Sequence, residues 1–114
     1  MNQQSKYFDA WDQMDPIPVA IGDRRLFTGE KCMMVHNTIL PKETIPTHKH
    51  PHEQLFFVLS GACDVTVCGE TRHLVAGGVA WFPGDEEHTV VNTLDEPLIA
   101  LDVFSPIRED FLAK

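Results

Sequence analysis

Short segments with the residue pattern of β-strands follow one another along this chain, and turn residues such as glycine, proline or aspartate separate them. This alternation is typical of a β-sandwich or barrel, whereas βαβ units would place helical patterns between the strands. The sequence therefore predicts an all-β protein. The expected strands are residues 33–40, a strand that leads into His48, and residues 55–59, 63–68, 71–75, 79–82, 88–92 and 98–104.

The chain has 114 residues, which is enough to bury one modest hydrophobic core. It contains no internal repeat, linker or low-complexity segment. We therefore expect one domain that covers residues 1–114. Only residues 108–114 have a helical pattern, and so short a helix must pack against the rest of the protein to be stable.

A group of histidines falls on the expected strands with the spacing of a metal site. His48 and His50 are two residues apart, so on an extended strand both rings point to the same face. Pro51 then interrupts the strand, and the next one begins at Gln54. A further histidine opens the expected strand 88–92. The expected ligands of a single ion are three imidazoles and one amide: His48, His50, His88 and Gln54.

This ligand set predicts one divalent transition metal without naming it, because three imidazoles and an amide suit Ni, Zn, Mn, Fe or Cu. Glu53 adjoins Gln54 and is the alternative fourth ligand. His52 follows the proline and is expected to face solvent or to support the ligands. His36 and His73 lack ligand-like spacing, so we expect structural roles for both.

These residues resemble the two sequence motifs of the cupin family. The first motif is matched by His48, His50, Gln54 and Gly61, and the second by Gly77, Pro83, His88 and Asn92. Lys42 and Asp85 stand where the motifs usually have glycine, and both positions are expected to lie in turns. The resemblance implies a double-stranded β-helix, the cupin jelly-roll barrel, with the ligand strands lining one open mouth.

An aspartate stands inside the last apolar strand. The period of two in a strand places Asp102 and Phe104 on the same face. A buried carboxylate destabilises a protein unless it is hydrogen-bonded, charge-paired or functional. Two interpretations stay open: an ion pair with Arg108, or an acid/base carboxylate that faces the metal cavity with Phe104 as a wall.

The block at residues 48–54 and the ending at residues 102–112 are similar to the KdgF-type cupins of pectin and alginate breakdown. That resemblance implies an enzyme that opens and ketonises 4,5-unsaturated monouronates, with Asp102, Phe104 and Arg108 at its functional positions. The planar guanidinium of Arg108 matches a carboxylate, as an anionic sugar substrate requires. The acidic run at residues 85–87 departs from the family, and carboxylates at the mouth of the site would repel such a substrate.

Two other functions fit the same metal motif. An Fe(II)-dependent cupin dioxygenase is one, because three histidines around iron leave positions open for O₂. A non-catalytic barrel that binds a metal or a small molecule is the other. A sulfonium lyase is disfavoured, because such cupins rely on an active-site tyrosine and Tyr7 is the only tyrosine here.

The formal net charge of −8 argues against nucleic acid or anionic lipid as partners, because both require a basic protein surface. No run approaches the ~18 apolar residues of a membrane span, and the polar start at residues 1–5 is unlike a signal peptide. We therefore expect a cytoplasmic protein that binds neither nucleic acid nor membranes.

Small cupins usually dimerise, so the resemblance also implies a homodimer. Tyr7, Phe8 and Trp11 would suit its interface. Cys63 and Cys68 would point to opposite faces of one strand, and Cys32 leaves the number of cysteines odd. We therefore expect buried or reduced thiols rather than a disulfide or a thiolate zinc site.

Overall fold

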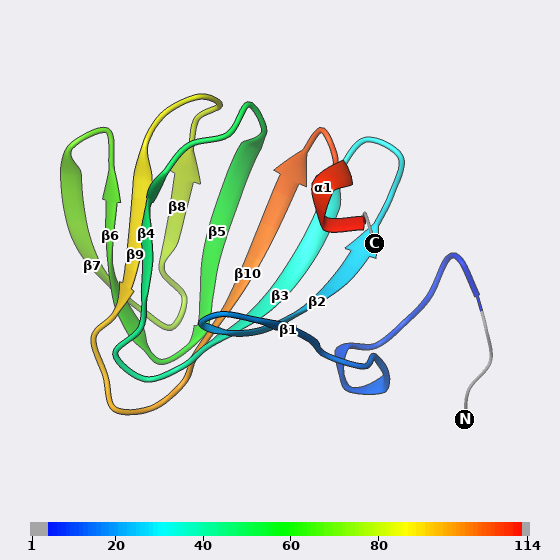
Figure 1. Ribbon diagram of the computed structural model, residues 1–114, viewed down its shortest axis with the longest axis horizontal. Coiled ribbons are helices and arrows are strands. Elements are labelled where there is room, and N and C mark those ends of the chain that lie inside the picture. The colour runs from blue at the N-terminus through cyan, green and yellow to red at the C-terminus, as the bar shows by residue number, and fades with distance from the viewer. Residues whose placement is uncertain (1–4, 113–114) are drawn as a thin grey trace.

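Two antiparallel β-sheets face each other in the computed structural model, which describes residues 5–112 (Figure 1). The six-stranded sheet has the order β1 (Ile17–Val19), β2 (Gly22–Thr28), β3 (Met33–Ile39), β10 (Leu98–Ser105), β5 (Glu53–Ser60) and β8 (Val79–Phe82). The four-stranded sheet has the order β4 (Thr44–His48), β9 (His88–Asn92), β6 (Ala62–Val67) and β7 (Glu70–Val75). A 3₁₀ turn, η1 (Trp11–Gln13), and a short helix, α1 (Glu109–Leu112), complete the described chain.

The all-β prediction is confirmed, and every strand expected from residue 33 onward is present within two residues of its expected limits. The first two strands were missed. Strand β2 contains Asp23, Arg24 and Arg25 and is only half-buried along most of its length, so it has no alternation of apolar and polar residues. Residues 1–4 of the polar start and residues 113–114 of the expected helix lie outside the described residues.

The hydrophobic core lies between the inner faces of the two sheets. Val58 and Leu98 of the larger sheet are fully buried there with Cys63 of the smaller one. In β10 every second side chain from Leu98 to Phe104 points inward, so Asp102 shares the inner face with Phe104 as predicted. A carboxylate therefore lies among the core side chains.

Turns with left-handed backbone occupy the glycine positions of both cupin motifs. Gly61 has a φ of 94° and Gly77 a φ of 93°. Lys42 and Asp85, which replace glycine at the other two positions, both have a φ of 63°. The predicted turns are therefore present, and side chains occupy a conformation that glycine adopts with less strain.

The C-terminal segment packs at one end of the cavity between the sheets. Phe104 belongs to a second buried cluster with Met33 and Val35, and Ile107 and Phe111 pack against that cluster. These contacts hold α1 beside the inner faces of β2, β3 and β10 (Figure 1). No helix within residues 5–112 is long and apolar enough to cross a membrane.

The three cysteines are all free. Cys63 is buried on the inner face, whereas Cys32 and Cys68 are exposed. Cys68 lies in the turn after β6 with a φ of 49°, so it is not on the strand where it was expected. The expectation of buried or reduced thiols is therefore met by all three, with Cys63 buried and Cys32 and Cys68 free on the surface.

Candidate metal centre and its cavity

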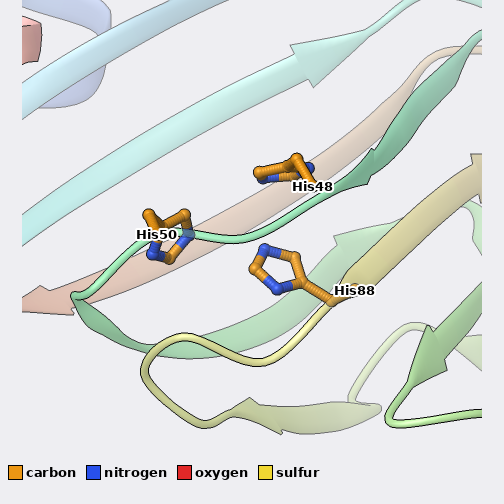
Figure 2. Close-up of side chains that lie close together, drawn as sticks. All are labelled: His48, His50 and His88. Atoms are coloured by element: carbon orange, nitrogen blue, oxygen red, sulfur yellow. The ribbon is translucent and has the colours of Figure 1, made fainter.

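Three histidines from two segments of the chain meet at one end of the barrel. His48 ends β4 and lies opposite His88 at the start of β9, while His50 follows in the loop before β5. One nitrogen of each ring lies within 4.8 Å of the others, and Figure 2 shows the three rings gathered around a common space. His50 is not on a strand as expected, yet the structure still brings it beside the other two. The cluster could hold a metal ion.

Backbone carbonyl groups set the tautomer of all three rings. In each histidine Nδ1 lies within hydrogen-bond distance of a carbonyl oxygen two residues away, at 2.8 Å for His48, 3.0 Å for His50 and 3.2 Å for His88. A carbonyl oxygen only accepts hydrogen bonds, so Nδ1 carries the proton and donates. Each Nε2 is then left with a free lone pair, which is how metal-binding histidines are commonly oriented.

Burial keeps two of the rings neutral. It lowers the pKa of His88 to about 4, and it also lowers the pKa of His50. Nε2 of His88 is buried and has no hydrogen-bond partner among residues 5–112. A neutral imidazole with an unpartnered lone pair is the form that binds a metal.

Gln54 lies beside the histidines, whereas its neighbour Glu53 does not. Oε1 of Gln54 is 3.0 Å from Nε2 of His50, and the side chain is buried at the start of β5. Glu53 is exposed on the other face of β5, where its carboxylate accepts a hydrogen bond of 2.9 Å from Nε1 of Trp81. Of the two alternative fourth ligands, only Gln54 therefore faces the cluster.

Asp102 is held by two amide groups. Its Oδ1 accepts a 2.8 Å hydrogen bond from Nε2 of Gln54, and its Oδ2 accepts a 2.7 Å bond from Nδ2 of Asn37. Burial raises the pKa of Asp102 to about 6, although the two amides and the charge of Arg108 act in the opposite direction. A buried carboxyl group that titrates close to neutral pH can both accept and return a proton.

Asn37 was not predicted as a site residue, although the sequence carried a signal for it. Inward positions of β3 alternate from Met33 through Val35 to Ile39, and Asn37 occupies one of them. A polar residue at an inward strand position is the same signal that singled out Asp102.

Arg108 does not form the ion pair with Asp102 that was weighed from the sequence. Its Nε and Nη2 donate to the two carboxylate oxygens of Asp110, at 3.0 and 2.8 Å. The guanidinium also stacks on the rings of Phe104 and Phe111, at 4.9 and 4.1 Å from their centroids. The aromatic wall that includes Phe104 therefore holds Arg108 beside the cavity.

The cavity between the sheets has a volume of about 440 Å³, which suits a small molecule. Its polar lining consists of Arg24, Asn37, His48, Gln54, His88, Asp102 and Arg108. Apolar side chains from both sheets, such as Ile39, Val90 and Phe104, form most of the rest. Candidate metal ligands, a carboxyl group and two guanidinium groups therefore line the same cavity.

The other histidines lie apart from this enclosure or at its edge. His36 packs against the ring of Trp11, and His73 pairs with Asp64 on the surface at 2.7 Å. His52 lies next to the cluster, with its ring centroid 5.5 Å from that of His50. The acidic side chains of residues 85–87 are exposed and do not line the cavity, so the expected repulsion at its mouth is weaker than the sequence suggested.

A family model described as a cupin domain matches residues 35–104. The chain belongs to the cupin family. It is 36% identical over 91 residues to the pectin degradation protein KdgF of Dickeya dadantii, covering 78% of this chain and 82% of that protein. The solved structure of KdgF from Halomonas sp. superposes with a TM-score of 0.85 at 28% identity and covers 91% of this chain and 96% of that one.

A third relative has the name of a dioxygenase. Gentisate 1,2-dioxygenase 1 of Aquipseudomonas alcaligenes is 39% identical over 66 residues, which is 56% of this chain and only 19% of that enzyme. The jelly-roll barrel implied by the sequence motifs is thus confirmed by the family model and by the solved KdgF structure.

Proposed function

We propose that this chain is a single-domain, metal-dependent enzyme that opens and ketonises 4,5-unsaturated monouronates. One observation carries the proposal: Gln54 links the histidine cluster to the buried carboxyl group of Asp102 inside one cavity. The similarity to proteins named KdgF, one of them a pectin degradation protein, supports this choice of substrate.

The metal would be held by His48, His50, Gln54 and His88, four neutral ligands. Such ligands would leave a divalent ion its full positive charge, and the bound ion would supply Lewis-acid stabilisation for a developing oxyanion. Nickel, zinc, manganese, iron and copper all suit this ligand set.

The reaction is an isomerisation without a redox step. The bond between C1 and the ring oxygen breaks while the hydroxyl group on C1 loses its proton, which yields an aldehyde at C1 and an enolate over C4, C5 and the former ring oxygen. Protonation at C4 then gives the ketone at C5. One proton leaves the hydroxyl oxygen and one arrives at carbon, so atoms and charge balance.

Asp102 moves these protons. Burial raises the pKa of its carboxyl group to about 6, which is close to neutral pH. The group can therefore accept the proton from the hydroxyl group and return one to C4. The amides of Asn37 and Gln54 fix the plane of the carboxyl group, because each donates to a different oxygen. Such fixing lowers the reorganisation that proton transfer requires.

Arg108 and Phe104 position the sugar. The guanidinium of Arg108 provides positive charge for the substrate carboxylate, and the enolate is also anionic. Phe104 is buried beside His50, with ring centroids 5.6 Å apart, and closes the apolar side of the site. The ring excludes water from the reacting atoms.

The test is an ultraviolet assay for loss of the conjugated C4–C5 double bond. Purified protein loaded with each candidate metal is mixed with several unsaturated monouronates, and each rate is compared with a protein-free control, because ketonisation also occurs spontaneously. Faster loss with at least one metal supports the proposal. Rates equal to the control for every metal and sugar contradict it.

A second candidate is an Fe(II)-dependent dioxygenase, favoured by the similarity of 66 residues to the gentisate dioxygenase. Three imidazole ligands with open positions on iron can activate O₂. Oxygen uptake by the Fe(II)-loaded protein with aromatic diols separates the two candidates. Uptake without any loss of the uronate double bond would favour the dioxygenase.

We also propose that the protein is a homodimer. The outer face of the six-stranded sheet exposes Leu55, Val79 and Trp81, and the aromatic residues Tyr7 and Phe8 are exposed as well. Large exposed apolar side chains gathered on one face mark an interaction surface. Light scattering of the wild type and of Trp81→Lys tests this, with a dimer and a shift toward monomer as the expected results.

A further inference from the structure

Arg24 is a second guanidinium group in the cavity, and it lies in the row of polar residues that reaches the histidines. On β2 it pairs directly with Asn37 of β3, so both side chains occupy the same face of the sheet. Asn37 bonds Asp102, and Asp102 is bonded in turn by Gln54. A continuous row of polar side chains therefore crosses the inner face of the six-stranded sheet from Arg24 to the histidine cluster.

Within residues 5–112 Arg24 has no ion pair and no side-chain hydrogen bond. Its Nε is buried without any acceptor, while its guanidinium stacks on the ring of Phe111 at 3.7 Å from the centroid. A buried donor without an acceptor destabilises a protein unless a ligand supplies the acceptor. The stacking fixes the plane of the guanidinium and leaves the N–H groups along its edge available to donate hydrogen bonds to a ligand.

Arg108 differs from Arg24 in this respect. The Nε and Nη2 edge of Arg108 already holds both carboxylate oxygens of Asp110. A substrate carboxylate could take that edge only by displacing Asp110. Arg24 therefore offers the cavity a guanidinium that forms no close ion pair in the described chain, while the carboxylate of Asp110 acts on its charge only from a longer distance.

We propose that Arg24 binds the carboxylate of the acid sugar and makes the cavity selective for uronates over neutral sugars, an inference that rests on the proposed function of the same site. A guanidinium bonds a carboxylate through two parallel N–H groups, which fixes orientation as well as charge. In a chain with a net charge of −8, anion binding needs such a local cation. Arg108, whose guanidinium also stacks on Phe111, adds its positive charge to the cavity while it keeps its pair with Asp110.

Calorimetric titration of the metal-loaded protein tests the inference with two probes, D-galacturonate and D-galactose, which differ by the carboxylate. The wild type should prefer galacturonate. Arg24→Gln should weaken galacturonate binding by at least ~10-fold and leave galactose binding unchanged, because one charged hydrogen-bonded pair contributes about that much. Arg24→Lys should recover only part of the loss, since an ammonium group cannot form the two-pronged contact.

Arg25→Gln is the matched control. Arg25 is the next residue of β2 and points to the opposite face, where it pairs with Asp23 at 3.4 Å, so the variant removes the same charge outside the cavity. Equal losses in Arg24→Gln and Arg25→Gln would mean that only the overall charge matters, and would overturn the inference. An equal loss for galacturonate and galactose in Arg24→Gln, together with a lower melting temperature, would assign Arg24 to packing against Phe111 and also overturn it.

Turnover separates this inference from the proposed reaction. If Arg24→Gln ketonises unsaturated uronates with an unchanged KM, the reaction stands and the role of Arg24 is wrong. If the wild type turns over no uronate, yet prefers galacturonate in a manner that depends on Arg24, the binding role stands and the reaction is wrong. Absence of any preference for the acid in the wild type overturns the binding role directly.

Discussion

Nε2 of His50 lies 3.0 Å from Oε1 of Gln54. Nδ1 of the same ring lies 3.0 Å from the carbonyl oxygen of His52, so both ring nitrogens face an oxygen that only accepts, and a neutral ring has one proton to donate. Gln54 donates from its Nε2 to Asp102, so its oxygen faces His50. When Nδ1 holds the proton of the neutral ring, Nε2 and Oε1 are both acceptors, and two acceptors this close repel each other unless a cation lies within reach of both.

The same distance is compatible with two neighbouring ligands of one metal. A metal ion would accept a lone pair from each of the two atoms and so remove the repulsion between them. Asp102 has a part in this arrangement, because it orients the amide so that the oxygen and not the nitrogen of Gln54 faces His50. Asp102 therefore affects the ligand set as well as the proposed proton transfer.

The first prediction concerns metal binding. The double variant His48→Ala, His50→Ala should lose the metal, because it removes two of three imidazoles, while its fold survives on the separate core around Val58 and Leu98. Loss of ligands weakens metal binding by at least ~10-fold. Elemental analysis and circular dichroism measure the two properties, and His73→Ala is the control outside the site. Full occupancy in the double variant would contradict the assignment.

Residue patterns predicted the inward positions of the candidate residues that lie on regular strands, whereas His50 and Arg108 lie outside the strands. The period of two was sufficient to place Asp102 and Phe104 on the inner face, and the same rule would have found Asn37. Arg24 gave no such signal, because β2 carries adjacent charged residues and no alternation of apolar and polar residues. The partner of Arg108 was also undetermined, since sequence distance alone does not choose between Asp102 and Asp110.

The second prediction concerns pH and the metal-free protein. Burial raises the pKa of Asp102 from 3.8 to about 6, so the folded state holds this proton more tightly than the unfolded chain does. The contribution of Asp102 to stability is therefore complete below pH 4 and is lost as the pH rises through 6. The loss amounts to about 3 kcal/mol in the free energy of unfolding.

Denaturant unfolding of wild type and Asp102→Asn at pH 4 and pH 7 measures this contribution. The asparagine variant has no proton to lose at this position, so it should gain stability relative to the wild type between the two pH values. Because both proteins share every other titrating group, the difference isolates Asp102. A difference that does not change with pH would show that Asp102 titrates at its ordinary value.

The third prediction concerns Arg108. Arg108→Lys should keep the charge and lose the planar group that stacks on Phe104 and Phe111. The value of kcat/KM for uronates should therefore fall by a factor that corresponds to roughly 2–4 kcal/mol of lost transition-state stabilisation. The melting temperature should change little, because the pair with Asp110 is exposed on one side and contributes at most about 1 kcal/mol. A large drop in melting temperature with unchanged kinetics would assign Arg108 to stability.

The last prediction separates an enzyme from a binding barrel. Asp102→Asn keeps the shape of the side chain and removes its acid/base group, so turnover should be ~10²–10⁴-fold slower, with metal and substrate still bound. The new amide can keep its bond from Gln54 if Asn37 rotates to present its oxygen, so the ligand set is preserved. Elemental analysis checks the metal, calorimetry checks the sugar, and the ultraviolet assay against a protein-free control measures the rate. A rate equal to that of the wild type would remove Asp102 from the reaction, since no other carboxyl group lines the cavity within residues 5–112.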